Sequence, residues 1–154
     1  MTDINKKPKE SLLYEIDYRA SDNLTSAKIY ANRSSIEVFK TISFDNEYEK
    51  NTSIDLFFSS IISDIIFSIN NYLNNKNIEY DDIELKTKAY ITNPLFLANV
   101  KGQNTISSIS RINIKIYIYT ETTEDVILSG IYTSTLYNTL KNSIAFTFEI
   151  IKIL

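Results

Sequence analysis

The chain has 154 residues, of which 44% are hydrophobic and 23% are charged, with a formal net charge of -3 and a pI near 5.0. This length suits a single domain with its own core, and the acidic balance argues against nucleic acid as a partner. The chain contains no cysteine and no histidine, which excludes disulfides, thiol nucleophiles and imidazole bases or metal ligands. Its two glycines, Gly102 and Gly130, are too few for a glycine-rich phosphate loop.

The first ten residues, "MTDINKKPKE", are charged and have no apolar segment of the kind found in signal peptides. We therefore expect residues 1–10 to be a disordered arm, residues 11–154 to form one domain, and the protein to be cytoplasmic. The longest unbroken apolar run falls far short of the ~18 residues that a membrane-spanning helix needs. The sequence accordingly predicts no membrane partner.

Alternation of apolar and polar residues predicts a three-stranded antiparallel meander over residues 11–45. The strands are expected in "LLYEIDYRA", "SAKIYAN" and "SIEVFKTISF", separated by the turn residues of "SDN" and "NRSS". The third segment places Ile36, Val38, Ile42 and Phe44 on one face.

A long apolar helix is predicted from about Thr52 to about Asn75, with Thr52 and Asp55 as a capping box. Apolar residues lie on nearly every side of it, interrupted by two narrow polar stripes. One stripe holds Asp55, Ser59, Ser63 and Asn70, and the other holds Ser60, Asp64, Ser68 and Asn71. Because one sheet of a chain this short could not cover such a helix, we predict a homodimer with this helix inside.

Two strands, a helix and a last strand are expected after the long helix. "DDIELKTKAYIT" and "ISRINIKIYIYT" alternate with period two, and "NPLFLANVKGQNT" between them is expected to be an irregular loop. Thr122 and Asp125 predict the capping box of a helix that ends near Lys141, and "SIAFTFEII" is the final strand. The order βββ-α-ββ-α-β predicts an α+β fold, with largely antiparallel sheets covered on one face by helices.

The segments "SIDLFFSSIISDI" and "STLYNTLKNSI", at these places in the order of elements, resemble the osmotically inducible protein C and organic hydroperoxide resistance (OsmC/Ohr) family over roughly residues 11–150. The resemblance implies an intertwined homodimer, in which sheets from both subunits wrap two central helices. Many members of this family reduce organic hydroperoxides with a peroxidatic cysteine on the first central helix. A resolving cysteine lies near the end of the second long helix, and a dithiol partner restores the pair.

Aligned on the resemblance, Asp64 stands at the peroxidatic position and Ser134 at the resolving position, and Thr135 replaces the proline that follows. A carboxylate cannot be oxidised to a sulfenic acid and a serine cannot resolve one. The thiol peroxidase mechanism is therefore excluded for this chain.

The resemblance also implies an acidic residue and an arginine at the site. Asp55, or its neighbour, corresponds to the acidic residue in the first turn of the central helix. The family arginine lies in the N-terminal strands, where Arg19 and Arg33 are the candidates. An arginine beside Asp64 would stabilise its carboxylate, as it would a thiolate.

A structural role for these residues is the simpler alternative. Asp64 could be a polar residue satisfied by its stripe partners Ser60, Ser68 and Asn71, and Ser134 an ordinary serine inside the second helix. The acidic run "EYDDIE" lacks the ordered spacing of a calcium loop. We therefore predict no metal and no cofactor.

Two classes of function remain. The first is a non-catalytic binding or structural dimer, whose former active-site pocket would take a small apolar or anionic ligand. The second is an enzyme that uses Asp64 as a general acid or base. An arginine and a deep cleft at Asp64 would favour the enzyme, whereas a pocket filled by Phe57, Phe58 or Leu136 would favour the binding protein. We prefer the first class, because one acid is little evidence for catalysis.

Overall fold

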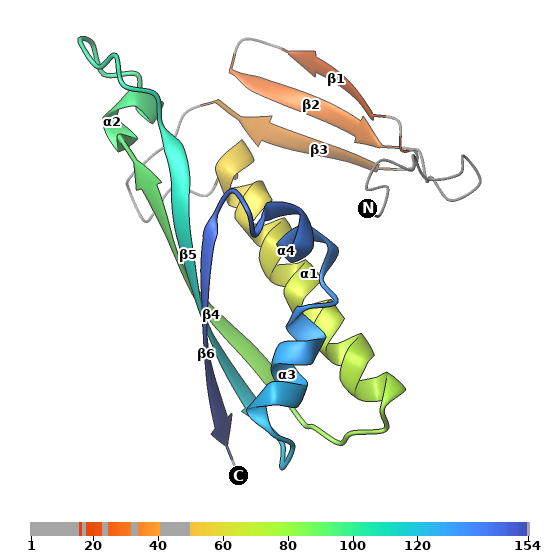
Figure 1. Cartoon of the computed structure of the whole chain (residues 1–154). Helices are drawn as coiled ribbons and strands as arrows, with labels where there is room; N and C mark the ends of the chain where they lie inside the picture. Colours follow the sequence, from red (N-terminus) through yellow and green to blue (C-terminus); the bar gives the residue numbers. More distant parts are fainter. Residues whose placement is uncertain (1–15, 17, 23–24, 32–33, 41–49, 154) are drawn as a thin grey trace, which may run out of the picture.

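The computed structural model describes residues 16, 18–22, 25–31, 34–40 and 50–153. They form two three-stranded sheets, a long helix and three short helices (Figure 1). In chain order the elements are β1 (Tyr18–Asp22), β2 (Ser26–Ala31), β3 (Ser34–Phe39), α1 (Ser53–Asn75), β4 (Ile83–Thr92), α2 (Pro94–Leu97), β5 (Ser108–Tyr119), α3 (Glu124–Ile131), α4 (Thr135–Leu140) and β6 (Ala145–Ile153). The expected arm, residues 1–10, lies outside the described residues.

The first sheet has the order β1-β2-β3 and is antiparallel throughout, as predicted for the N-terminal meander. Its boundaries differ from the prediction, because β1 runs through Ser21 and Asp22, where a turn was expected, and β3 ends at Phe39. The predicted face residues Ile42 and Phe44 lie outside the described residues. All five residues of β1 are exposed and Ile36 in β3 is 49% exposed, while Ile29, Val38 and Phe39 are half-buried. Among the described residues, this sheet therefore has no fully buried apolar side chain.

The second sheet has the order β4-β5-β6 and carries the core. Strands β4 and β5 are antiparallel, whereas β5 and β6 are parallel. The prediction of largely antiparallel sheets is therefore confirmed with one exception. The exception arises because α3 and α4 carry the chain back between β5 and β6, as a parallel pair requires.

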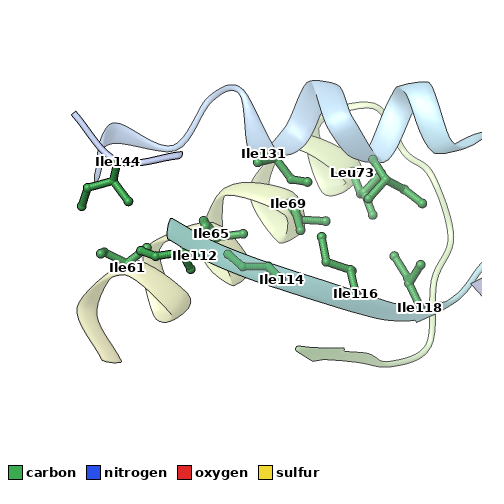
Figure 2. Close-up of a cluster of buried hydrophobic side chains, with 11 residues drawn as sticks. Ile61, Ile65, Ile69, Leu73, Ile112, Ile114, Ile116, Ile118, Ile131 and Ile144 are labelled. Atoms are coloured by element: carbon green, nitrogen blue, oxygen red, sulfur yellow. The ribbon is translucent and has the colours of Figure 1, made fainter. Parts of the chain in front are cut away.

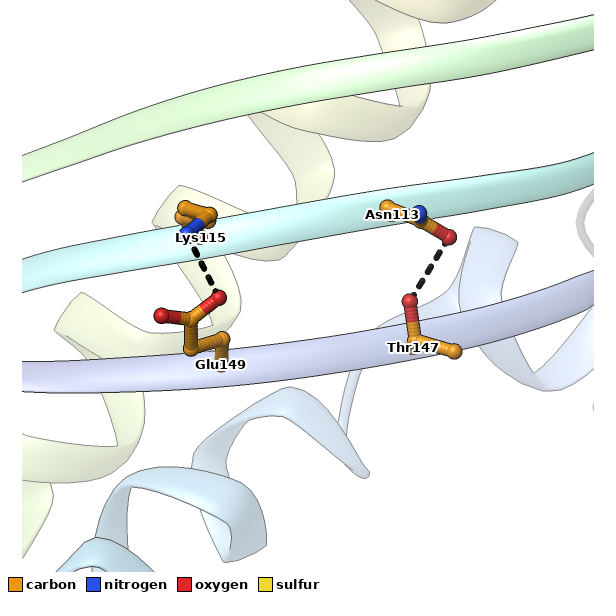
Figure 3. Close-up of polar contacts among 4 residues, drawn as sticks. All are labelled: Asn113, Lys115, Thr147 and Glu149. Carbon is orange, nitrogen blue, oxygen red and sulfur yellow. Dashed lines mark hydrogen bonds and ion pairs between the residues drawn. The ribbon is translucent and has the colours of Figure 1, made fainter.

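Cross-strand pairs on the face of the second sheet away from the helices hold the parallel register (Figure 3). Lys115 Nζ lies 2.7 Å from Glu149 Oε2, and Thr147 Oγ1 donates a hydrogen bond of 2.7 Å to Asn113 Oδ1. The hydrogen bond and the charge of Glu149 raise the pKa of Lys115 above its ordinary value.

The core lies between α1, α3 and the inner face of β5 (Figure 2). It consists of ten isoleucines and one leucine, which are Ile61, Ile65, Ile69, Leu73, Ile112, Ile114, Ile116, Ile118, Ile127, Ile131 and Ile144. Each such side chain contributes about 1.5–3 kcal/mol when fully buried. Gly130 lets α3 approach α1 closely, because a Cβ there would lie 3.1 Å from the Cα of Ile69.

Helix α1 begins and ends where the sequence predicts. Thr52 Oγ1 accepts a hydrogen bond from the Asp55 N–H at 3.4 Å, and Asp55 Oδ2 accepts one from the Thr52 N–H at 2.8 Å, so the capping box is confirmed. The helix is followed by Lys76 as its C-cap and by Asn77, which has a positive φ of 54°.

Within one chain, α1 is covered on one side only. The stripe from Ile61 to Leu73 is buried, but Ile62 and Ile66 are half-buried and Phe67 is 63% exposed. By length and composition alone, α1 is the one helix among the described residues that could cross a membrane, and 17% of its most apolar stretch is buried. The sequence analysis counted unbroken apolar runs and therefore underestimated how long and apolar this helix is. Serines and asparagines interrupt the apolar run, but the helix continues through them.

The second long helix predicted from the sequence is two short helices. α3 is capped by Thr123 rather than by Thr122, without a side-chain cap hydrogen bond, and the helix breaks before α4. Ser134 is the N-cap of α4, where its side chain accepts a hydrogen bond from the Tyr137 N–H. Such local side-chain hydrogen bonds compete with continuous helix. The loop predicted between β4 and β5 also contains a single helical turn, α2, which begins with Pro94.

Candidate functional site

The candidate site lies where the middle of α1 meets the start of α4. Asp64 Oδ2 accepts a hydrogen bond of 2.5 Å from Ser134 Oγ and another of 3.0 Å from the Leu136 N–H. Ser134 is completely buried, whereas Asp64 is half-buried. One carboxylate oxygen therefore ties together two elements that are 70 residues apart in the sequence.

The hydroxyl of Ser134 both donates and accepts a hydrogen bond. It donates to Asp64 and accepts from the Tyr137 N–H at 3.0 Å, as an N-cap serine does. The Ser134 carbonyl accepts from Asn138 Nδ2 at 2.8 Å, and the same nitrogen donates to the Tyr132 carbonyl at 2.7 Å. The break between α3 and α4 is thereby fixed on both sides, and the hydroxyl of Ser134 has no exposed surface through which a substrate could reach it.

The structure therefore changes two expectations about these residues. Ser134 is not an ordinary serine inside a helix, because it caps one and contacts α1. Asp64 accepts its hydrogen bonds from Ser134 and Leu136, not from its stripe partners, and Ser60 Oγ donates instead to the Leu56 carbonyl at 2.8 Å. The Leu136 N–H was missed by the sequence analysis. The preference of serine for N-cap positions is the signal that could have revealed the helix break.

Of the remaining candidates, the structure places neither Arg19 nor Asp55 at Asp64. Arg19 lies in β1 with its guanidinium carbon 5.4 Å from the centroid of the Tyr30 ring, and Arg33 lies outside the described residues. Asp55 serves the capping box at the start of α1, nine residues from Asp64 and hence about 13 Å away along the helix. In the described part of the chain, the ion pairs are Glu84–Lys86 and Lys115–Glu149, and neither involves Asp64.

The three apolar residues that the sequence analysis named for this pocket lie on α1 and α4. Phe57, Phe58 and Leu136 are partly buried against the core, and the two phenylalanine rings meet edge to face at 5.7 Å. A pocket of about 650 Å³ lies elsewhere, beyond the C-terminal end of α1. Its lining is formed by Ile78, Glu79, Tyr80, Asp81, Tyr119, Thr120, Glu121, Thr122 and Ile153. Within the described residues, no three acidic side chains come together as a metal site would require.

A long helix packed on a mixed sheet, with a separate N-terminal meander and a paired crossover of short helices, defines an α+β fold that known structures share. The chain is similar to an OsmC-like protein from Mycoplasma pneumoniae (TM-score 0.70, 15% identity, covering 92% of this chain and 99% of that one). It is also similar to an organic hydroperoxide resistance protein from Elizabethkingia anophelis (TM-score 0.70, 12% identity, covering 93% and 99%) and to one from Legionella pneumophila (TM-score 0.66, 9% identity, covering 90% and 97%).

These likenesses extend over nearly the whole of each chain, so the protein has the OsmC/Ohr fold, and the resemblance seen in the sequence is confirmed at the level of the fold. No protein-family model matches the sequence, and no curated protein matches it either.

Proposed function

We propose that this chain is a non-catalytic homodimer of OsmC/Ohr ancestry, which kept the fold and lost the thiol chemistry, and which serves as a binding or structural protein. The observation that carries the proposal is the one-sided cover of α1. A 23-residue helix that is apolar on nearly every side is covered by the rest of its own chain along a single stripe. A second copy is the simplest cover for the other sides.

The first sheet supports the same assembly. Tyr18 is 64% exposed and Ile36 is 49% exposed, although both lie in strands whose apolar residues need a cover. In the described residues, the two sheets share no strand, so β1, β3, β4 and β6 are all edge strands. Open edges are places where another chain can pair, and sheets built from both subunits would use them.

The Asp64–Ser134 contact supports the non-catalytic part of the proposal. Asp64 holds the start of α4 through two hydrogen bonds, which is a structural task. An enzyme that used Asp64 as a general acid or base would need a substrate cleft beside it. The pocket of about 650 Å³ lies beyond the C-terminal end of α1 rather than at Asp64, and Phe57, Phe58 and Leu136 are partly buried against the core. A ligand bound here would be small and apolar, since an anion would meet the carboxylate of Asp64.

The proposal is tested by Phe67→Glu, which places a charge on the uncovered face of α1. Sedimentation equilibrium should show a wild-type dimer at micromolar concentration, as expected for an interface in the range of ~1,200–2,000 Å² or larger. Phe67→Glu should weaken the dimer about thirtyfold or more, because losing a central interface aromatic costs about 2 kcal/mol or more.

Tyr119→Glu is the matched control, because Tyr119 is a 45% exposed aromatic at the end of β5 rather than on α1. It should leave the dimer intact. A wild-type chain that is monomeric at micromolar concentration, or that enters detergent micelles through α1 instead of pairing, would contradict the proposal.

A further inference from the structure

The β4–β5 hairpin differs in charge from the rest of the chain. Between Glu84 and Glu121 there is no acidic residue, while the same stretch holds five cations. These are Lys86, Lys88, Lys101, Arg111 and Lys115. The stretch therefore carries +5 in a chain whose net charge is -3.

The same hairpin exposes apolar side chains at its tip, which we define as residues 93–107. Leu95 is 48% exposed, Phe96 41%, Val100 44% and Ile106 76%. The tip contains α2 and the loop into β5, and it projects beyond the other elements at the upper left of Figure 1. Four large apolar side chains are thus exposed within one short segment, and exposed apolar residues that gather in this way mark interaction sites more often than singly scattered ones do.

Cations and a tyrosine lie in this apolar tip and on the two strands that lead to it. Lys101 is exposed within the tip itself. On the adjoining end of the sheet, Tyr90 is paired with Arg111 in register, and the Arg111 guanidinium lies 4.3 Å from the centroid of the Tyr90 ring. Lys88 follows on the same strand and is also exposed. An amphipathic tyrosine ring beside cations is typical of residues that lie at the level of lipid headgroups.

We propose that the hairpin tip docks on an anionic lipid bilayer, with its apolar side chains entering the headgroup layer and Lys101, Arg111 and Lys88 contacting lipid phosphates. Burial of apolar area together with attraction of basic residues to anionic lipid is what drives such interfacial binding. A single-stranded nucleic acid would match the charge but not the tip, because stacking needs aromatic faces and three of the four exposed side chains are aliphatic. This proposal departs from the prediction of no membrane partner, which was based on the lack of a long unbroken apolar run.

Flotation with lipid vesicles tests this proposal on the full chain. Vesicles containing about 30% phosphatidylserine in phosphatidylcholine should carry wild-type protein to the top of the gradient, and pure phosphatidylcholine vesicles should carry much less. Raising the salt concentration should weaken the binding, because the attraction between exposed charges is screened. Equal binding to both kinds of vesicle, or binding to neither, would overturn the proposal.

Two kinds of variant test the cations and the apolar side chains of the tip separately. Lys101→Glu should weaken binding to anionic vesicles roughly tenfold or more, whereas Lys141→Glu, the same change at the exposed C-cap of α4, should have a much smaller effect. Leu95→Ser combined with Ile106→Ser should abolish flotation and leave the circular dichroism melt unchanged, because both side chains are at the surface.

If Lys101→Glu and Lys141→Glu weaken binding equally, only net charge matters and the tip is not the site. If the double serine variant floats like wild type, the apolar part of the proposal is wrong. If that variant instead dissociates the dimer seen by sedimentation, the tip is an interface between copies, and the membrane proposal fails while the proposed dimer stands.

Discussion

The two sheets of this molecule have similar alternating sequences, but their apolar residues are buried to very different extents. In the second sheet, β5 buries Ile112, Ile114, Ile116 and Ile118 almost completely beneath α1. In the first sheet, the strands are five or six residues long, and an apolar residue such as Ile36 is half exposed. Alternation therefore specifies a strand, but burial depends on what lies over it.

The difference follows from where the helices are. Helices α1, α3 and α4 all lie on the inner face of the second sheet (Figure 1), where α1 precedes β4 and the crossover between β5 and β6 contains α3 and α4. The first sheet is connected to α1 through a bridge between Phe39 and Thr52. The second sheet therefore has its cover within one chain, whereas the first leaves apolar residues such as Ile36 exposed, which a partner subunit would cover in the proposed dimer.

The largest expected effect is that of removing a core side chain from the second sheet. Ile114→Ala should lower the free energy of unfolding by about 2–5 kcal/mol, because it deletes buried methyl groups and leaves a cavity. Ile114 is 1% exposed and lies between β4 and β6 in the central strand. Urea denaturation followed by circular dichroism measures this loss.

Ile36→Ala makes the same chemical change in the first sheet and serves as the matched comparison. It should cost less than about 1 kcal/mol in unfolding of the isolated chain, since Ile36 is 49% exposed there, and its effect should appear instead as weaker dimerisation. Equal losses from the two variants in monomeric protein would show that the first sheet is covered within its own chain, and the contrast between the sheets would be wrong.

An intermediate effect is expected from loosening the crossover that makes the second sheet self-sufficient. Ser134→Ala removes the cap of α4 and one of the two hydrogen bonds to Asp64. We expect a loss of about 1–3 kcal/mol in unfolding free energy, from a missing N-cap and from a carboxylate that loses a donor. Thermal and urea denaturation at neutral pH provide the measurement.

Ser129→Ala is the control for this change, because Ser129 is a half-buried serine of α3 that donates only to the Asp125 carbonyl of its own helix. It should be close to neutral. If Ser134→Ala is as harmless as Ser129→Ala, the contact with Asp64 is not a structural tie, and the use of Asp64 as an acid or base becomes the better explanation.

Much of the fold was predictable because its signals are local. The capping box of Thr52 and Asp55, the isoleucine face of β5 and the alternation of β4 each depend on residues within a few positions of one another. The parallel pairing of β6 was not predictable in this way, because periodicity identifies a strand without identifying its neighbour. The signal that was present, a strand–helix–strand order with a long connection, permits a parallel crossover but does not require one.

The candidate site shows the same limit. Composition excluded thiol and imidazole chemistry outright, and the resemblance drew attention to Asp64 and Ser134 together. The hydrogen bond between them spans 70 residues, and no pattern within either segment specifies it. The helix break at Ser134 was missed because "EDVILSGIYTSTLYNTL" has enough apolar residues at helical spacing to predict one helix, and the tertiary contact with α1 stabilises two instead.

The smallest expected effect concerns the exposed face of the second sheet, where Lys115 and Glu149 join β5 to β6 (Figure 3). The hydrogen bond and the negative charge of Glu149 raise the pKa of Lys115 above its ordinary value of 10.5. The folded state therefore holds this proton more tightly than the unfolded state does. The resulting stabilisation is fully present below pH 10.5 and is lost as the pH rises through the higher pKa of the folded protein.

Glu149→Gln should therefore flatten the alkaline limb of the stability curve, measured by urea denaturation between about pH 9 and pH 12, and should change stability little at neutral pH because exposed ion pairs contribute little. Glu84→Gln is the control, since Glu84 faces Lys86 at 3.6 Å with both side chains more exposed. An unchanged alkaline limb in Glu149→Gln would mean that the backbone ladder and the Thr147–Asn113 hydrogen bond hold the parallel register without the ion pair. The stability of the second sheet within one chain would then come from its buried face and not from this ion pair.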